Sequence, residues 1–61
     1  MTHEQITEVV PGGSYELLDV AHDEHGREVA HVEYSDARRG YVREELDGSI
    51  HFLRPEEIDA N

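Results

Sequence analysis

The dipeptide Asp47-Gly48 is the feature that most constrains how this 61-residue chain folds. Asp-Gly between two apolar stretches is typical of a tight β-hairpin, because glycine supplies the positive φ that the turn requires. The flanking residues 41–46 and 49–53 are rich in β-forming side chains. We therefore predict two antiparallel strands joined by a two-residue turn, which would place Glu44 opposite His51 in a cross-strand ion pair.

The preceding part of the chain repeats this pattern. Residues 14–22 and 27–34 have strand character, with a turn at 23–26 between them and a polar loop at 35–40 after them. Alternation in the second strand puts Ala30, Val32 and Tyr34 on one face. Apolar residues occur on both faces of the predicted meander, which favours an all-β fold, a small SH3-like barrel of four to five strands. A β-rich α+β fold, with the N-terminal segment packed as a helix across the sheet, is the alternative.

The two ends of the chain carry weaker signals. Thr2 and Gln5 fit a capping box, so residues 1–13 are predicted to form a short helix or an arm. Pro55 ends the last strand or opens a short helical turn. The barrel domain is thus expected to span residues 14–58, followed by a frayed tail at 59–61.

The charge balance restricts the partners. Fifteen acidic residues against five arginines and no lysine give a formal net charge of −10. This composition disfavours direct binding to nucleic acid and to anionic membranes. No segment has the pattern of a membrane span or a signal peptide, so we expect a cytoplasmic location. The acid excess fits either a salt-adapted surface or an acidic face that docks onto a protein with a basic surface, and a homodimer is left open.

Catalytic motifs are absent from the sequence. There is no cysteine and no glycine-rich phosphate loop, and no motif places a nucleophile, so we expect a non-enzymatic protein without a cofactor. His22, His25 and His31 are weak candidates for a metal or small-molecule site. Two histidines three residues apart fall short of the four ligands of a structural zinc site, which favours exposed turn residues.

The tyrosines are the better candidates for binding. Tyr15, Tyr34 and Tyr41 are each expected at a strand end beside a loop. Tyrosines near acidic loops suit extended peptides and cationic side chains, although half-buried packing residues with hydrated hydroxyls have the same pattern. The predicted partner-binding set consists of Tyr15, Tyr34, Tyr41, Asp36, Glu44 and Glu45. An acidic DNA-mimic inhibitor of phage type is the rival function, because such a protein also presents carboxylates to a basic site.

Three stretches carry a family resemblance. Residues 15–22 (YELLDVAH), 32–34 (VEY) and 53–58 (LRPEEI) resemble a family of small bacterial and phage domains of unknown function. That family has a Tyr-rich first strand, an Ala-x-His step, a Val-x-Tyr strand and a terminal Arg-Pro motif. Leu53 stands where the family has an aromatic residue. The resemblance covers residues 12–58 and implies a compact β domain, an SH3-like barrel, with no activity of its own.

Overall fold

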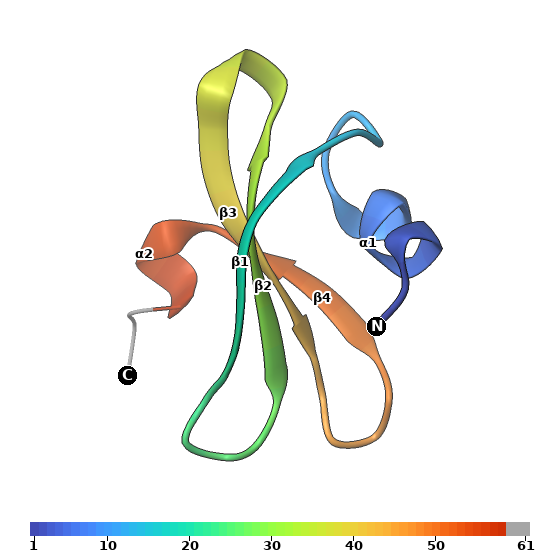
Figure 1. Ribbon diagram of the computed structural model, residues 1–61, viewed down its shortest axis with the longest axis vertical. Helices are drawn as coiled ribbons and strands as arrows, with labels where there is room; N and C mark the ends of the chain where they lie inside the picture. The colour runs from blue at the N-terminus through green and yellow to red at the C-terminus, as the bar shows by residue number, and fades with distance from the viewer. Residues whose placement is uncertain (59–61) are drawn as a thin grey trace.

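The computed structural model describes residues 1–58, which form one four-stranded antiparallel sheet and two short helices (Figure 1). The elements in chain order are α1 (His3–Val9), β1 (Glu16–His22), β2 (Glu28–Tyr34), a 3₁₀ turn (Ser35–Ala37), β3 (Arg38–Glu44), β4 (Ile50–Leu53) and α2 (Pro55–Ile58). The strands lie in the order β1-β2-β3-β4. No helix within residues 1–58 is long and apolar enough to cross a bilayer. The predicted frayed tail, residues 59–61, lies outside the described residues.

The predicted antiparallel meander is confirmed, but the closed SH3-like barrel is not. The sheet is open, with β1 at one edge and β4 at the other. The segments before β1 and after β4 contain helices, and α1 and α2 lie on opposite sides of the sheet (Figure 1). A helix over each face covers apolar residues that a barrel would otherwise have enclosed, so the chain adopts the β-rich α+β alternative.

Helix α1 begins at the predicted capping box. The Thr2 hydroxyl accepts from the Gln5 backbone N–H, and the Gln5 side chain accepts from the Thr2 backbone N–H at 2.7 Å. Ile6 and the C-cap residue Val10 lie four positions apart and are both buried. They pack against the same face of the sheet, and the buried core consists of Ile6, Val10, Ala30, Val32 and Val42.

The β3–β4 turn corrects the predicted register. The Glu45 N–H donates to the Ser49 carbonyl at 2.8 Å and the Gly48 N–H to the Glu45 carbonyl at 2.9 Å. The loop therefore contains three residues, with Gly48 at φ 91°, and is not a two-residue turn. The register moves by one residue, so Arg43 faces His51 and Glu44 faces Ile50. The predicted Glu44–His51 pair is wrong.

The β1–β2 turn has the same form. The Asp23 N–H donates to the Arg27 carbonyl at 3.0 Å, and the Gly26 N–H donates to the Asp23 carbonyl at 3.0 Å. Gly26 takes a φ of 79°. Both hairpins therefore end in a loop closed by a glycine, and both ends lie at the same side of the sheet, at the bottom of Figure 1.

Strand β3 begins at Arg38, earlier than the predicted loop at 35–40 allowed, and it includes Gly40. A Cβ on Gly40 would lie 2.6 Å from Cε1 and Cζ of Phe52 and 3.1 Å from the Leu53 carbonyl oxygen. The Phe52 ring also meets the Tyr34 ring edge-on, with centroids 5.2 Å apart. The missing side chain at Gly40 thus provides the space for the Phe52 ring.

We predict that Gly40→Ala destabilises the fold by about 2 kcal/mol, because overpacking forces the Phe52 ring or the β4 backbone to move. Thermal unfolding followed by circular dichroism measures the change. Adding Phe52→Leu to Gly40→Ala should cost less than the sum of the two single changes, since the smaller side chain relieves the clash. An unfolding midpoint for Gly40→Ala equal to that of the parent would contradict this packing.

Candidate functional site

The structure brings together only part of the predicted binding set. Tyr15 and Tyr34 line a shallow open hollow of about 330 Å³ where β1 begins and β2 ends. Its other lining residues are Ser14, Glu16, Glu33 and Ser35, and we call it the tyrosine hollow. Asp36 follows directly in the adjoining turn, exposed and at φ 59°.

Both tyrosine rings are held by neighbours within the molecule. The Tyr15 hydroxyl lies 2.8 Å from Nδ1 of His3, and the two rings are 5.2 Å apart. Tyr34 packs against Phe52 and, like Tyr15, borders the buried core. The two tyrosines are thus half-buried packing residues, as one of the two interpretations predicted. Because the rings are fixed by these contacts, the tyrosine hollow is preformed.

Two carboxylates face each other beside the tyrosines. Glu16 of β1 is paired directly with Glu33 of β2 in the strand register. Like charges in opposite cross-strand positions are destabilising. Glu33 has partial compensation from Arg39, whose Nε lies 3.6 Å from its Oε2, whereas Glu16 is exposed. Among residues 1–58, Glu33 is thus the member of this pair with an arginine within ion-pair distance, and Glu16 has a like charge opposite to it.

Tyr41 lies away from the tyrosine hollow. It is paired with His31 in the register, and the two rings stack with centroids 4.6 Å apart and 11° between their planes. Alternation along β3 puts Tyr41 on the face opposite to the buried Val42. Tyr41 therefore belongs to the side of the sheet that carries α2.

Glu44 and Glu45 are engaged by cations of the protein itself. Glu44 lies 3.5 Å from the Met1 amine, which also donates to Glu28 at 2.7 Å. The hydrogen bond to Glu28 raises the pKa of that amine. Glu45 accepts from Arg27 Nη1 at 3.0 Å and, through its other oxygen, from Arg43 Nε. These two predicted binding residues lie at the hairpin end of the sheet, opposite to the tyrosine hollow.

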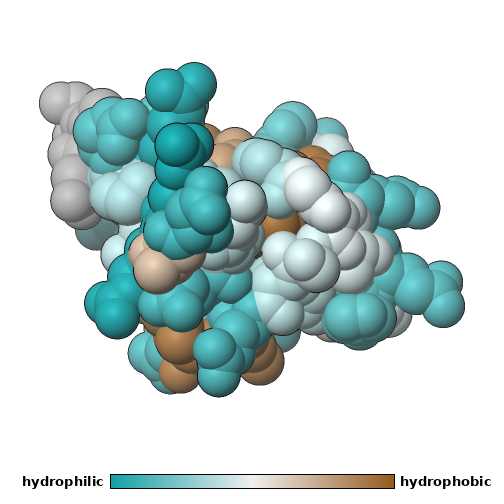
Figure 2. Space-filling view, turned by 90° about the horizontal axis from the view of Figure 1, so that it is seen from above, coloured by the Kyte–Doolittle hydropathy of each residue, from teal (hydrophilic) through white to brown (hydrophobic). Residues whose placement is uncertain are grey.

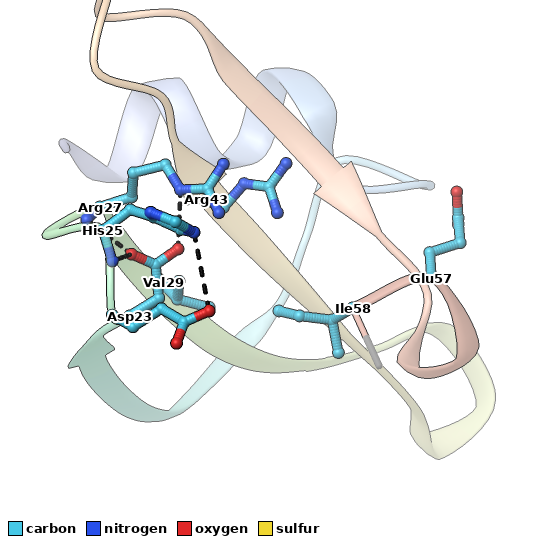
Figure 3. A pocket seen from close by; sticks show the side chains of 8 residues that line it. Asp23, His25, Arg27, Val29, Arg43, Glu57 and Ile58 are labelled. Carbon is cyan, nitrogen blue, oxygen red and sulfur yellow. Dashed lines mark hydrogen bonds and ion pairs between the residues drawn. The ribbon is translucent and has the colours of Figure 1, made fainter. Parts of the chain in front are cut away.

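Glu45 is part of a chain of alternating charges, which we call the hairpin-end network: Asp23, Arg27, Glu45 and Arg43. The network borders a half-open hollow of about 400 Å³ between the first hairpin and α2. In Figure 3, Ile58 extends from α2 toward Val29, and dashed lines include the bond between Arg27 and Asp23. Within residues 1–58 the acids and arginines of the network are paired with one another.

The network also perturbs its carboxylates. The hydrogen bond from Arg43, together with that from Arg27, holds the pKa of Glu45 below its ordinary value despite partial burial. Burial alone would raise the pKa of Asp23. Hydrogen bonds from the backbone and side chain of Arg27 and from the His25 backbone outweigh that effect and lower it. Both acids are therefore more stable as carboxylates in the fold than in the unfolded chain.

The three histidine candidates do not form a cluster. His22 ends β1, His25 lies in the following turn, and His31 stacks on Tyr41 in the middle of the sheet. Within residues 1–58 no three His, Cys, Asp or Glu side chains gather in a metal-binding arrangement.

Asp47, Ser49 and His51 have the residue types of a catalytic triad but not its order. The Ser49 hydroxyl donates to Asp47 Oδ1 at 2.6 Å, and His51 Nε2 lies 3.3 Å from the same hydroxyl. The hydrogen bonds from Ser49 lower the pKa of Asp47. In a triad the imidazole lies between serine and carboxylate and removes the serine proton. Here the serine is central and donates a hydrogen bond to the carboxylate, so these three residues stabilise the turn.

The sequence prediction missed Glu16 and Glu33. Both were visible as strand acids, but only the register shows that they face each other. That register includes a bulge at Leu18, between the paired positions Leu17 and Asp19, for which the sequence has no local signal. An Asp23–Gly26 turn defines the hairpin, yet it does not specify the partner of Glu16.

Comparisons with protein-family models, with curated proteins and with solved structures found no match to this chain. The resemblance to small bacterial and phage domains therefore stays a prediction.

We predict that Glu45→Gln lowers the thermal midpoint at neutral pH and that the difference from the parent narrows in acid. The pKa of Glu45 is depressed from 4.5, so its carboxylate stabilises the fold above that pH. This contribution is lost as the pH falls through the folded-state pKa. Thermal melts of both proteins from neutral pH into the acid range measure it.

Glu56→Gln is the matched control, because Glu56 is exposed on α2 and the change in charge is the same. It should show little difference from the parent at any pH. A gap between Glu45→Gln and the parent that stays constant into the acid range would exclude the hairpin-end network as its source.

Proposed function

We propose that this protein is a non-enzymatic binding module that engages a basic protein surface or peptide at the tyrosine hollow. The observation that carries the proposal is the directly opposed pair Glu16 and Glu33 beside the half-exposed rings of Tyr15 and Tyr34. Alternation puts the two carboxylates on the face of the sheet opposite to the tyrosine rings, so a lysine or arginine of the partner would compensate the carboxylates while a neighbouring side chain of the partner contacts a ring. The exposed Asp36 adds a third acid at the rim.

The energetics of the opposed pair favour a binding role over a purely structural one. A like-charge cross-strand pair lowers the stability of the fold. Residues that cost stability in this way are expected at functional sites. Glu44, Glu45 and Tyr41 leave the proposed contact set, because all three lie away from the tyrosine hollow. The proposed set is Tyr15, Tyr34, Asp36, Glu16 and Glu33.

A DNA-mimic inhibitor would use the same carboxylates. It differs in its partner, which would be a nucleic-acid-binding protein, and in the expectation that DNA competes for that partner. An aromatic ring recognises a cationic side chain itself. The tyrosine hollow therefore favours a basic peptide side chain as the ligand over a protein site built for the phosphates of a nucleic acid. We therefore place the basic peptide first.

The test uses a short arginine-containing peptide, with a version carrying neutral citrulline in place of arginine. The protein should bind the arginine peptide more tightly, and Glu16→Gln should weaken that binding by about tenfold, since one carboxylate of the pair is lost. Fluorescence anisotropy with labelled peptide measures both. The Glu56→Gln variant, which has the same net charge as Glu16→Gln, should bind the arginine peptide nearly as tightly as the parent does.

The same variant separates binding from folding. Because Glu16→Gln removes a like-charge pair, it should raise stability by about 0.5 kcal/mol while it weakens the peptide complex. Equal affinities for the arginine and citrulline peptides, or equal losses in Glu16→Gln and Glu56→Gln, would overturn the proposal.

A further inference from the structure

Strand β1 is an uncovered edge of the sheet. All seven of its residues are exposed, and among the described residues 1–58 its only neighbour in the sheet is β2. One side of an edge strand carries backbone N–H and C=O groups that no neighbouring strand satisfies. An extended segment of another chain can pair with such groups and become a further strand.

The apolar layer of the core continues onto this edge without a cover. Leu17 and Val20 are paired with Val32 and Ala30, so they share the face of the buried core. Their exposed fractions are nevertheless 51% and 46%. Among the strands, helix α1 makes most of its contacts with β4, at the far side of the sheet from β1. Figure 2 shows small hydrophobic areas between the hydrophilic side chains of the surface, some of them at the outline of the molecule.

Charge is distributed unevenly across the sheet. Strands β1 and β2 together contain four acids and neither lysine nor arginine: Glu16, Asp19, Glu28 and Glu33. Strand β3 contains three of the five arginines. The β1 side of the sheet is therefore acidic, and it is the side on which the open edge lies.

We infer that β1 is the docking edge for an extended cationic segment of a partner protein, which adds to the sheet as a fifth strand. This inference rests on the proposed function and specifies its mode. The added backbone pairs with β1, apolar side chains of the segment extend the layer over Leu17 and Val20, and its cations lie near Glu16 and Asp19 on the other face. The start of β1 contributes to the tyrosine hollow, so both contacts belong to one surface.

Charge complementarity selects this occupant over a second copy of the chain. Two β1 strands paired with each other would bring together two sets of acids from proteins that each carry −10. Like charges in adjacent strands oppose pairing. The bulge at Leu18 further interrupts the regular edge that symmetrical pairing would need.

The test compares two peptides with identical side chains, which alternate lysine or arginine with valine or threonine. In one, three consecutive central amides are N-methylated, which preserves the charges and removes the backbone donors. The unmethylated peptide should bind at least about tenfold more tightly, because strand addition derives its affinity from main-chain hydrogen bonds. Amide hydrogen exchange measured by NMR should show new protection in β1 and none in β4.

A pair of substitutions tests the apolar part. The double variant Leu17→Thr and Val20→Thr keeps the β propensity of an exposed strand. It should lower the affinity for the unmethylated peptide by about fivefold, because apolar contact area is lost. Leu46→Thr is the matched control, because Leu46 is 78% exposed in the β3–β4 turn, outside β1. It should leave the affinity unchanged.

The outcomes separate this inference from the proposed function. Equal affinities for both peptides, with loss of binding in Glu16→Gln, would overturn strand addition and leave the basic partner in place. If the unmethylated peptide, the N-methylated peptide and the arginine peptide of the earlier test all fail to bind, both proposals are overturned. Protection of β1 amides that rises with protein concentration, without peptide, would identify a second copy as the occupant and overturn the inference.

Discussion

The packing of α1 on one face of the sheet is the contact on which the rest of the structure depends. The buried core contains five residues, all aliphatic and none larger than isoleucine: Ile6, Val10, Ala30, Val32 and Val42. Helix α1 has seven residues, and its segment contributes two of these five side chains: Ile6 from the helix and Val10 from its C-cap. It can cover one part of a twisted sheet, and it covers the part toward β4. On the same face, Leu17 and Val20 of β1 remain 51% and 46% exposed.

The sequence predicted the parts of the fold that are set by local chemistry. The capping box at Thr2, the alternation of Ala30 and Val32, and the helical turn after Pro55 are all present. The barrel was not predictable in the same way. Apolar residues on both faces of a meander are satisfied equally by closure or by a helix on each side. Which one occurs depends on distances between segments that no local pattern encodes.

Turn length determined the cross-strand neighbour of Glu44, one of the predicted binding residues. Asp-Gly is compatible with two-residue and three-residue loops, and the distinction rests on hydrogen bonds of the folded turn. Asp47 Oδ1 accepts from both the backbone and the hydroxyl of Ser49, at 2.9 and 2.6 Å. A register shift of one residue changes every cross-strand neighbour. For this reason the position of an acid in the sequence did not show whether its carboxylate is paired within the protein. Glu45 is bound by Arg27, 18 residues away, whereas Glu16 has a like charge opposite to it.

The acidic edge connects stability with binding. A 61-residue chain without disulfides has a folding free energy of about 3–5 kcal/mol at most from its core. A ligand that binds only the folded state at one hundred times its dissociation constant adds about 2.7 kcal/mol. Carboxylates along β1 keep the edge from pairing with copies of itself, which is how natural sheets avoid aggregation. The same carboxylates attract a cationic strand, and that strand would cover the apolar layer that α1 leaves open. In the inferred mode of binding, the partly exposed apolar layer and the acid excess are two aspects of one arrangement, in which a strand of the partner completes the sheet.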